Sequence, residues 1–209
     1  MASSFIEQTP AIINLVEKLK PNKILDIGKG FGKYGFLFHE YIGIDNTKKI
    51  NPSISLKEQS RIEMDAVEID PDLMLPHLSH IYNHIYFGDI LDIYKQLPIY
   101  DLILMIDIIE HINKKGAVNL LQHFLKQGTN IIIATPKDFF EQHLYESEYE
   151  NHVSHWSVKD FKNLGFLNAQ YFDAGVVYLV SVEKLDIRGF GNTFLKKMRR
   201  LARALKNEL

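Results

Sequence analysis

A carboxylate followed by alternating glycines forms the first candidate ligand site. Asp26 precedes Gly28, Gly30 and Gly32 in an Asp-x-Gly-x-Gly-x-Gly pattern. Glycines let the backbone approach a ligand closely, and a helix that starts after them offers unpaired N–H groups to an anion. Residues 30–35 also fit the G-x-G-x-x-G pattern of dinucleotide sites. Asp26 favours another ligand, because its carboxylate would repel a pyrophosphate and attract an ammonium or sulfonium.

A second group of reactive side chains follows a later apolar run. Asp107, Glu110 and His111 have the i, i+3, i+4 spacing that places side chains on one face of a helix. His152 adds an imidazole downstream. Since neutral imidazole can remove a proton near pH 7, both histidines are candidate general bases. Asp107 with Glu110 is also an Asp-x-x-Glu capping box, which predicts a helix that begins at this point.

Short apolar strands that alternate with helical segments must position these groups. Strands are predicted at 23–27, 64–68, 84–87, 101–106 and 130–135, and a terminal hairpin at 167–172 and 176–182. Helices are predicted at 9–19, from about 33, at 116–126 and at 157–164. Continuous apolar strands indicate a mostly parallel sheet covered on both faces. We therefore expect an α/β fold: a doubly wound sheet of about seven strands, with a terminal antiparallel hairpin and helices on both faces.

Four motifs in this order resemble those of class I S-adenosylmethionine-dependent methyltransferases. They are Ile24-Leu25-Asp26-Ile27-Gly28-Lys29-Gly30-Phe31-Gly32, Val67-Glu68-Ile69-Asp70-Pro71, Gly88-Asp89-Ile90, and Tyr100 to His111. The resemblance implies a Rossmann-like fold with S-adenosylmethionine as cofactor. By the same resemblance, Glu68 binds the ribose diol and Asp89 contacts the adenine amino group. The full implied cofactor set is Asp26, Gly28, Gly30, Gly32, Glu68, Ile69, Asp89, Ile90 and Asp107.

Two positions depart from the family pattern. Glu68 follows Asp26 by 42 positions, whereas about 20 is usual between such a loop and its ribose acid. Asp45 would fit the shorter spacing if Tyr41 to Asp45 were the second strand. We favour Glu68, because a helix is predicted directly after it, and Asp45 stays the alternative. Lys29 occupies a position that is usually small or uncharged in the family, so we expect its side chain to reach the cofactor carboxylate or solvent.

The later group resembles small-RNA 3′-end 2′-O-methyltransferases, in which Glu-x-x-Glu-His and a later histidine hold a divalent ion. That resemblance implies Mg²⁺ or Mn²⁺ at Asp107, Glu110, His111 and His152. Such an ion would lower the pKa of an acceptor hydroxyl. Glu-His at this place also occurs in class I methyltransferases without a metal. Glu110, His111 and His152 are then the catalytic candidates in their own right.

Composition narrows the chemistry further. The 209 residues include no cysteine, which excludes cytosine C5 methylation through a cysteine adduct and radical methylation on a cysteine-ligated cluster. No Asn/Asp-Pro-Pro-aromatic motif follows the fourth strand, so DNA base methylation is not expected. We expect methyl transfer to an oxygen or nitrogen of a small-molecule acceptor. The alternatives are a metal-assisted RNA 2′-O-methyltransferase, a non-catalytic cofactor-binding scaffold, and a nucleotide-dependent oxidoreductase favoured only by the overlapping glycine pattern.

The chain is expected to divide into a methyltransferase domain at 1–187 and a basic amphipathic helix at 188–209. Within the domain, about 41–61 reads as an insertion and about 138–150 as an acidic lid. The tail has seven basic residues and one acid, although the whole chain has a net charge of -2. It could contact RNA, an anionic membrane or another protein surface. Without a long apolar stretch or a signal-peptide pattern, a cytoplasmic protein is expected.

Overall fold

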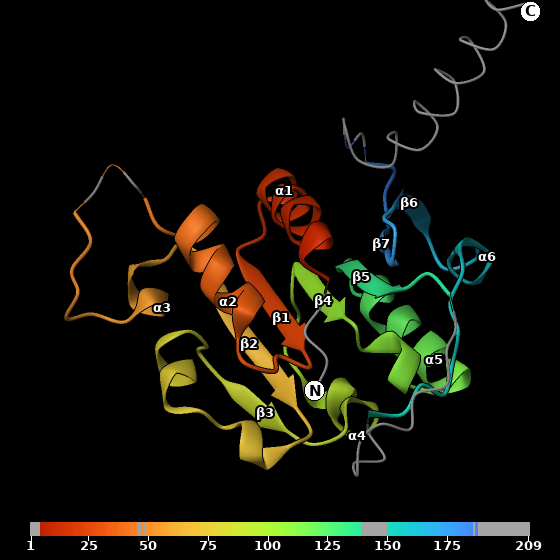
Figure 1. Ribbon diagram of the computed structural model, residues 1–209, viewed down its shortest axis with the longest axis horizontal. Helices are drawn as coiled ribbons and strands as arrows, with labels where there is room; N and C mark the ends of the chain where they lie inside the picture. The colour runs from red at the N-terminus through yellow and green to blue at the C-terminus, as the bar shows by residue number, and fades with distance from the viewer. Residues whose placement is uncertain (1–4, 46, 48, 139–149, 186, 188–209) are drawn as a thin grey trace, which may run out of the picture.

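A seven-stranded sheet forms the centre of the computed structural model, which describes residues 5–45, 47, 49–138, 150–185 and 187 (Figure 1). Its strands are β1 (Lys23–Ile27), β2 (Glu63–Glu68), β3 (Ile85–Phe87), β4 (Leu102–Ile106), β5 (Asn130–Pro136), β6 (Phe166–Tyr171) and β7 (Gly175–Ser181). The order is β3-β2-β1-β4-β5-β7-β6, and only the pairs that involve β7 are antiparallel. The predicted Rossmann-like sheet with a terminal hairpin is confirmed.

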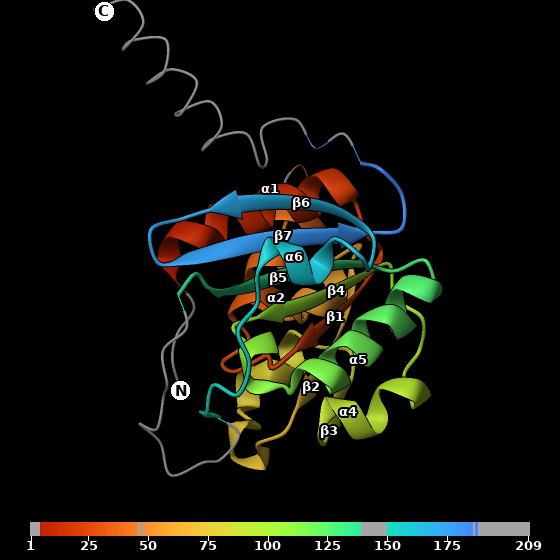
Figure 2. The ribbon, with the colours of Figure 1, turned by 90° about the vertical axis from the view of Figure 1, so that its right-hand side faces the viewer.

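Helices cover both faces of the sheet, as predicted (Figures 1 and 2). α1 (Thr9–Leu19) and α2 (Lys33–Phe38) pack on one face, and α4 (Ile90–Ile93), α5 (Lys114–Lys126) and α6 (Val158–Phe161) on the other. Successive residues of a strand point to opposite faces. Ile24 therefore joins the core under α1, whereas Leu25 joins the core under α5. Strands buried on both sides explain the continuous apolar runs.

The order in which strands are added reverses beside β1. After β1 the chain adds β2 and β3 on one side, and then returns to place β4 on the other side of β1. Ile27 and Met105 are partners in the register of β1 with β4. In open α/β sheets, ligands bind outside the carboxyl ends of the strands at such a switch point. The fold thus directs attention to the loops that follow β1 and β4.

The short connecting elements correct two expectations. The helix predicted after Glu68 is replaced by two 3-10 helices, because Pro76 lacks the N–H that a single helix running on from Pro71 would need. Tyr41 to Asp45 is no strand, because most of it lies in a π-helix. The connecting elements are η1 (Ile6–Gln8), the π-helix η2 (His39–Gly43), α3 (Leu56–Gln59), η3 (Pro71–Leu73), η4 (Pro76–His80), η5 (Tyr94–Gln96) and η6 (Ile109–His111).

The stretch at about 41–61, predicted to be an insertion, contains the end of η2 and α3, where Ser55 and Glu58 form a capping box. Of the predicted acidic lid, only Asp138 and Glu150 are among the described residues, and the predicted helix at 188–209 lies outside them. Within the described part of the chain, no helix is long and apolar enough to cross a membrane.

Candidate active site

A cleft of about 1000 Å³ opens at the carboxyl ends of the strands. That volume lies within the range of about 300–1,000 Å³ typical of small-molecule sites. Most predicted site residues line it: Asp26, Gly28, Gly30, Glu68, Ile69, Asp89, Ile90, Asp107, Glu110, His111 and His152. Gly32 is outside the lining and caps the start of α2. A smaller hollow of about 340 Å³, near α1 and β6, contains none of these residues.

The glycine loop has a backbone that only glycines adopt easily. Gly28, Gly30 and Gly32 have positive φ angles of 73°, 51° and 79°, a region that costs other residues about 1–2 kcal/mol. Space is also limited, since a Cβ on Gly28 would lie 2.0 Å from Cδ1 of Ile108. The N–H of Gly28 donates to the carbonyl of Val67 at 2.9 Å. The loop is therefore fixed against the end of β2.

Asp26 is a buried carboxylate beneath this loop. Its Oδ2 accepts a hydrogen bond from the Tyr82 hydroxyl at 2.6 Å. Burial raises the pKa of Asp26 to about 6, although the Tyr82 bond opposes the rise. A cation bound nearby would favour the ionised form. The position therefore suits a ligand that carries an ammonium or sulfonium.

Glu68 ends β2 and faces the same cleft. Its Oε1 accepts from the backbone N–H groups of Ile69 and Asp70 at 3.0 and 3.2 Å, and its Oε2 accepts from the N–H of Gly30 at 3.3 Å. Asp45, the alternative ribose acid, is exposed, and its Oδ1 accepts from the backbone and hydroxyl of Thr47. Asp45 is not part of the cleft lining, so the geometry favours Glu68.

Lys29 behaves differently from the sequence-based expectation. Its side chain is fully buried, and Nζ donates to the carbonyl of Leu73 at 3.0 Å. The same ammonium lies 3.6 Å from Oε2 of Glu68. Burial lowers the pKa of Lys29, and Glu68 opposes that change. The ammonium is thus held inside the protein next to Glu68, rather than in solvent.

Asp107 stands in a strained conformation at the end of β4. Its φ is 53°, and its N–H donates to the carbonyl of Ala134 at 2.9 Å. The helix predicted to start at Asp107 is wrong, because this bond holds Asp107 in a non-helical conformation and η6 begins only at Ile109. Its buried Oδ1 has no hydrogen-bond partner among the described residues. Burial raises the pKa of Asp107 to about 6, and Lys33 counteracts the rise.

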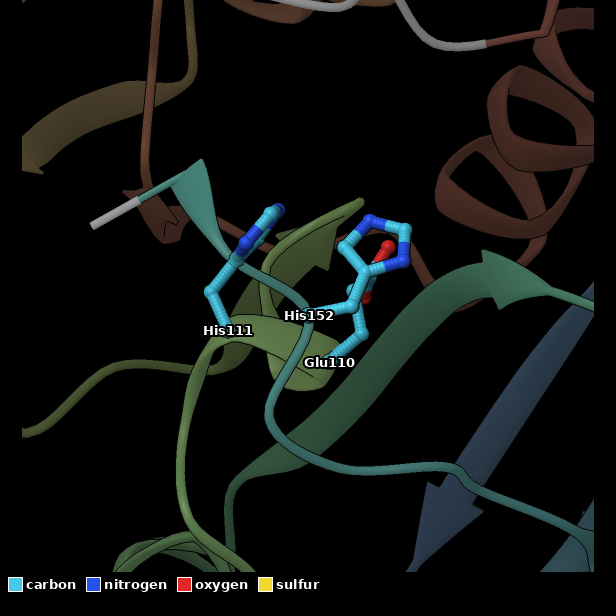
Figure 3. Close-up of side chains that lie close together, drawn as sticks. All are labelled: Glu110, His111 and His152. Atoms are coloured by element: carbon cyan, nitrogen blue, oxygen red, sulfur yellow. The ribbon is translucent and has the colours of Figure 1, made fainter. Parts of the chain in front are cut away.

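Glu110, His111 and His152 project to the same side from η6 and the segment at 150–157 (Figure 3). One potential ligand atom from each lies within 4.8 Å of the others, and Asp107 is not part of this group. The two imidazole rings meet edge to face at 5.0 Å. Burial raises the pKa of Glu110 to about 8 and lowers that of His111. Thr135 donates from its hydroxyl to Oε2 of Glu110 at 3.1 Å.

A strap of residues, 153–156, holds His152 in this position. The N–H groups of Val153 and Ser154 donate to the carbonyl of Glu110 at 2.9 and 3.0 Å. The Ser154 hydroxyl donates to the carbonyl of Ile112 at 2.8 Å. The indole N–H of buried Trp156 donates to the carbonyl of Ile109 at 3.1 Å. Sequence reasoning missed Ser154 and Thr135, because isolated hydroxyl residues have no recognisable spacing.

The cleft has side chains of the types that a divalent metal ion and a cationic cofactor would each need. One carboxylate and two imidazoles can hold a first-row divalent ion such as Mn²⁺, although Glu110 would have to release a proton to do so. The buried acids Asp26 and Asp107, together with the open accepting position on Asp107, fit a ligand that carries positive charge.

Comparison with known proteins supports the fold assignment. No family model matches the chain. An uncharacterized protein of Methanocaldococcus jannaschii is 26% identical over 181 residues, which cover 86% of this chain and 69% of that protein. The methyltransferase domain of bacterial CtHen1 superposes with a TM-score of 0.56 at 13% identity, covering 85% of this chain and 97% of that one.

An O-methyltransferase family protein from Burkholderia thailandensis has a TM-score of 0.54 at 8% identity, covering 84% of this chain and 56% of that chain. Its name and that of the CtHen1 domain describe methyltransferases, and the strand order and cleft position agree with such a fold. The chain therefore has the fold of class I S-adenosylmethionine-dependent methyltransferases.

Proposed function

We propose that the protein transfers a methyl group from S-adenosylmethionine to an oxygen or nitrogen atom of a small-molecule acceptor. The observation that carries this proposal is the convergence of Asp26, Glu68 and Asp89 on one cleft, each from the end of a different strand. Together with the glycine loop, these acids provide acceptors for a cationic centre, a diol and an amino group. The solved structures with the same fold include methyltransferases.

The cofactor supplies the electrophilic methyl group when it is bound. The chain contributes mainly by positioning the reactants, which can account for much of the rate of such a transfer. Asp26 and Asp107 place negative charge where a sulfonium or ammonium is stabilised. Glu68 accepts from ribose hydroxyls, and Asp89 is available to an exocyclic amine. The strap at 153–156 fixes the acceptor side by holding His152 beside His111.

His111 and His152 are the proposed proton acceptors. Nδ1 of His111 lies 3.1 Å from the carbonyl of Asn151. Because a carbonyl only accepts, Nδ1 carries the proton and Nε2 has the lone pair that can receive another. Burial keeps the pKa of His111 below its usual value, so the ring is neutral near pH 7. A neutral imidazole is the form that removes a proton from a hydroxyl or ammonium acceptor.

A second candidate is metal-assisted 2′-O-methylation of RNA, favoured by the group of Glu110, His111 and His152. Mg²⁺ or Mn²⁺ at these residues would supply Lewis-acid chemistry that lowers the pKa of an acceptor hydroxyl. The basic segment at 188–209 would provide the phosphate contacts, as it also could for an anionic membrane.

Ligand-dependent thermal unfolding tests the proposal. S-adenosylmethionine or S-adenosylhomocysteine at about 100 times its Kd should stabilise the protein by about 2.7 kcal/mol, and methyl transfer should follow with a suitable acceptor. Stabilisation by NAD but by neither adenosyl ligand would contradict the proposal. Stabilisation without transfer to any acceptor in a broad panel would favour the non-catalytic scaffold.

Glu110→Gln separates the two candidates. In the metal-assisted reaction, this variant should lose the activity that depends on Mg²⁺ or Mn²⁺ and retain cofactor binding, because the amide is a much poorer ligand for these ions. Glu150→Gln, which alters another cleft-lining acid outside the group of three, is the matched control. Equal turnover of Glu110→Gln and wild type with added metal would reject the metal-assisted candidate.

A further inference from the structure

Lys29 is a buried cation in a loop built of glycines. Burying an ammonium costs free energy unless a nearby group compensates its charge, so Lys29 needs such a group. That group is Glu68, whose Oε2 lies 3.6 Å from Nζ. The side chain of Lys29 is fully buried, and only 6% of the Glu68 side chain is exposed. The pair therefore lies within the protein, at the rim of the cleft that receives the proposed cofactor.

The contacts of Lys29 join two segments that are distant in sequence, the glycine loop and the turn after β2. Its backbone belongs to the loop after β1, where its carbonyl accepts from the N–H of Gly32 at 2.9 Å. Its ammonium donates to the carbonyl of Leu73 at the end of η3 and lies beside Glu68 at the end of β2. One side chain thus fixes the separation between the glycine loop and the turn after β2, which together form one side of the cleft.

The two carboxylate oxygens of Glu68 differ in their remaining capacity. Oε1 accepts two backbone bonds, at 3.0 and 3.2 Å, which fix the orientation of the carboxylate. Oε2 has longer contacts, 3.3 Å to the N–H of Gly30 and 3.6 Å to Lys29. Both exceed the common N–H···O distance of about 2.9–3.0 Å. Oε2 therefore keeps accepting capacity for a ligand hydroxyl, and the neighbouring ammonium balances its charge.

We propose that Lys29 is a positioning residue that makes Glu68 selective for a ribose diol. This inference rests on the proposed function, since it assumes that an adenosyl ligand occupies the cleft. The ammonium places a positive charge beside Oε2 and holds the carboxylate aligned, so a ligand with both ribose hydroxyls gains charge-assisted hydrogen bonds that a deoxyribose ligand lacks. Without Lys29, Glu68 would keep its place in the sequence and lose the cation that balances its buried charge.

The test compares ligand pairs that differ only at the ribose. Calorimetry gives the Kd of S-adenosylhomocysteine and of its 2′-deoxy and 3′-deoxy analogues for the wild type, Lys29→Met and Lys23→Met. Lys23→Met is the matched control. Lys23 lies in β1 and pairs with two acids of β2, Glu63 and Asp65, near the opposite ends of these strands. Removal of a hydrogen bond to a charged group should weaken wild-type binding about tenfold or more.

In Lys29→Met we expect the deoxy penalty to fall to about threefold or less, and in Lys23→Met to match the wild type. A general loosening of the loop would weaken the ribose and deoxyribose ligands equally and leave their ratio unchanged. In the methyl-transfer reaction, the KM for S-adenosylmethionine should rise in Lys29→Met while kcat at saturation stays within about threefold of the wild type.

An unchanged deoxy penalty in Lys29→Met would overturn the role of Lys29 while leaving the proposed function intact. Failure of the wild type to bind any adenosyl ligand would overturn both. If Lys29→Met does not fold, Lys29→Gln takes its place, since its amide is neutral and can still donate a hydrogen bond. The same collapse of the deoxy penalty is expected there, and an undiminished penalty would contradict the inference.

Discussion

Buried carboxylates lie toward both ends of the strands, and the two ends differ in whether these carboxylates have hydrogen-bond partners within the protein. Toward the amino ends of the strands, the fully buried Asp65 of β2 is bonded to His84 and Tyr100, which precede β3 and β4, and both of its oxygens are occupied. It accepts from the Tyr100 hydroxyl at 2.8 Å and from the backbone and ring of His84 at 3.0 and 3.1 Å. Near the carboxyl ends, Asp107 has a buried oxygen without a partner among the described residues.

This difference separates acids that hold the fold together from acids that await a ligand. A buried polar group with internal partners stabilises the protein, whereas one without them costs free energy until something binds. Raised pKa values occur at the carboxyl ends of the strands, where burial acts on Asp26, Asp107 and Glu110. Perturbed acids that gather in one cleft are a feature of functional sites.

The largest expected effect is a loss of stability, caused by a substitution toward the amino ends of the strands. Asp65→Ala would leave the Tyr100 hydroxyl and the His84 N–H without their acceptor. We expect a loss of about 3–5 kcal/mol in the free energy of unfolding, measured with urea, because one partner of a buried network is removed. Ligand affinity, measured below the unfolding transition, should stay within about threefold of the wild type. A large loss of affinity with little loss of stability would contradict the distinction between structural acids toward the amino ends of the strands and ligand-binding acids at their carboxyl ends.

The second expected effect is a gain in the free energy of unfolding, and its size depends on pH. The folded-state pKa of Asp26 is raised from 3.8 to about 6. Its contribution to stability is therefore fully present below pH 3.8 and is lost as pH rises through about 6. A rise of this size corresponds to about 3 kcal/mol. Asp26→Asn keeps an acceptor for Tyr82 and removes this loss, so at pH 7.5 it should be more stable than the wild type by up to that amount.

The same variant should bind S-adenosylmethionine at least about 30-fold more weakly, because a buried charge pair with the ligand is lost. Urea unfolding from pH 4 to pH 8 and calorimetry supply the two measurements. Tyr82, Glu68 and Lys29 face residue 26 in both proteins, so the difference between the two pH curves isolates Asp26. Parallel curves for the two proteins would show that Asp26 does not titrate in this range.

The smallest expected effect is seen by comparing two glycines, Gly28 after the carboxyl end of β1 and Gly128 before the amino end of β5. Gly28 and Gly128 both have positive φ angles, 73° and 87°, so the backbone strain of alanine should cost about 1–2 kcal/mol of stability at either position, and the contact with Ile108 adds to that cost at Gly28. Only Gly28 lies in the cleft, where an added methyl group meets Ile108, while the space around Gly128 is open. Gly28→Ala should weaken ligand binding, and Gly128→Ala should not. Equal ligand Kd values for the two variants would argue against cofactor contact with this loop.

Much of the site could be predicted because its residues lie at or just after the carboxyl ends of buried strands, which meet at one side of a parallel sheet. Asp26 was recognised from its place beside the glycines, and Glu68 and Asp89 from the resemblance of their motifs to those of methyltransferases. The prediction failed at Asp107, where a local capping pattern competed with a bond to Ala134, 27 positions away. Tyr82 was missed for a related reason, since its bond to Asp26 spans 56 positions and leaves no periodic pattern.

The strap at 153–156 makes one local unit of two segments that are distant in the sequence. Val153, Ser154 and Trp156, which follow His152, donate hydrogen bonds to backbone carbonyls of 109–112. These carbonyls belong to η6 and the residue after it, and η6 also carries Glu110 and His111. A change that displaces the strap should therefore separate the two proposed proton acceptors from each other before it disturbs the sheet.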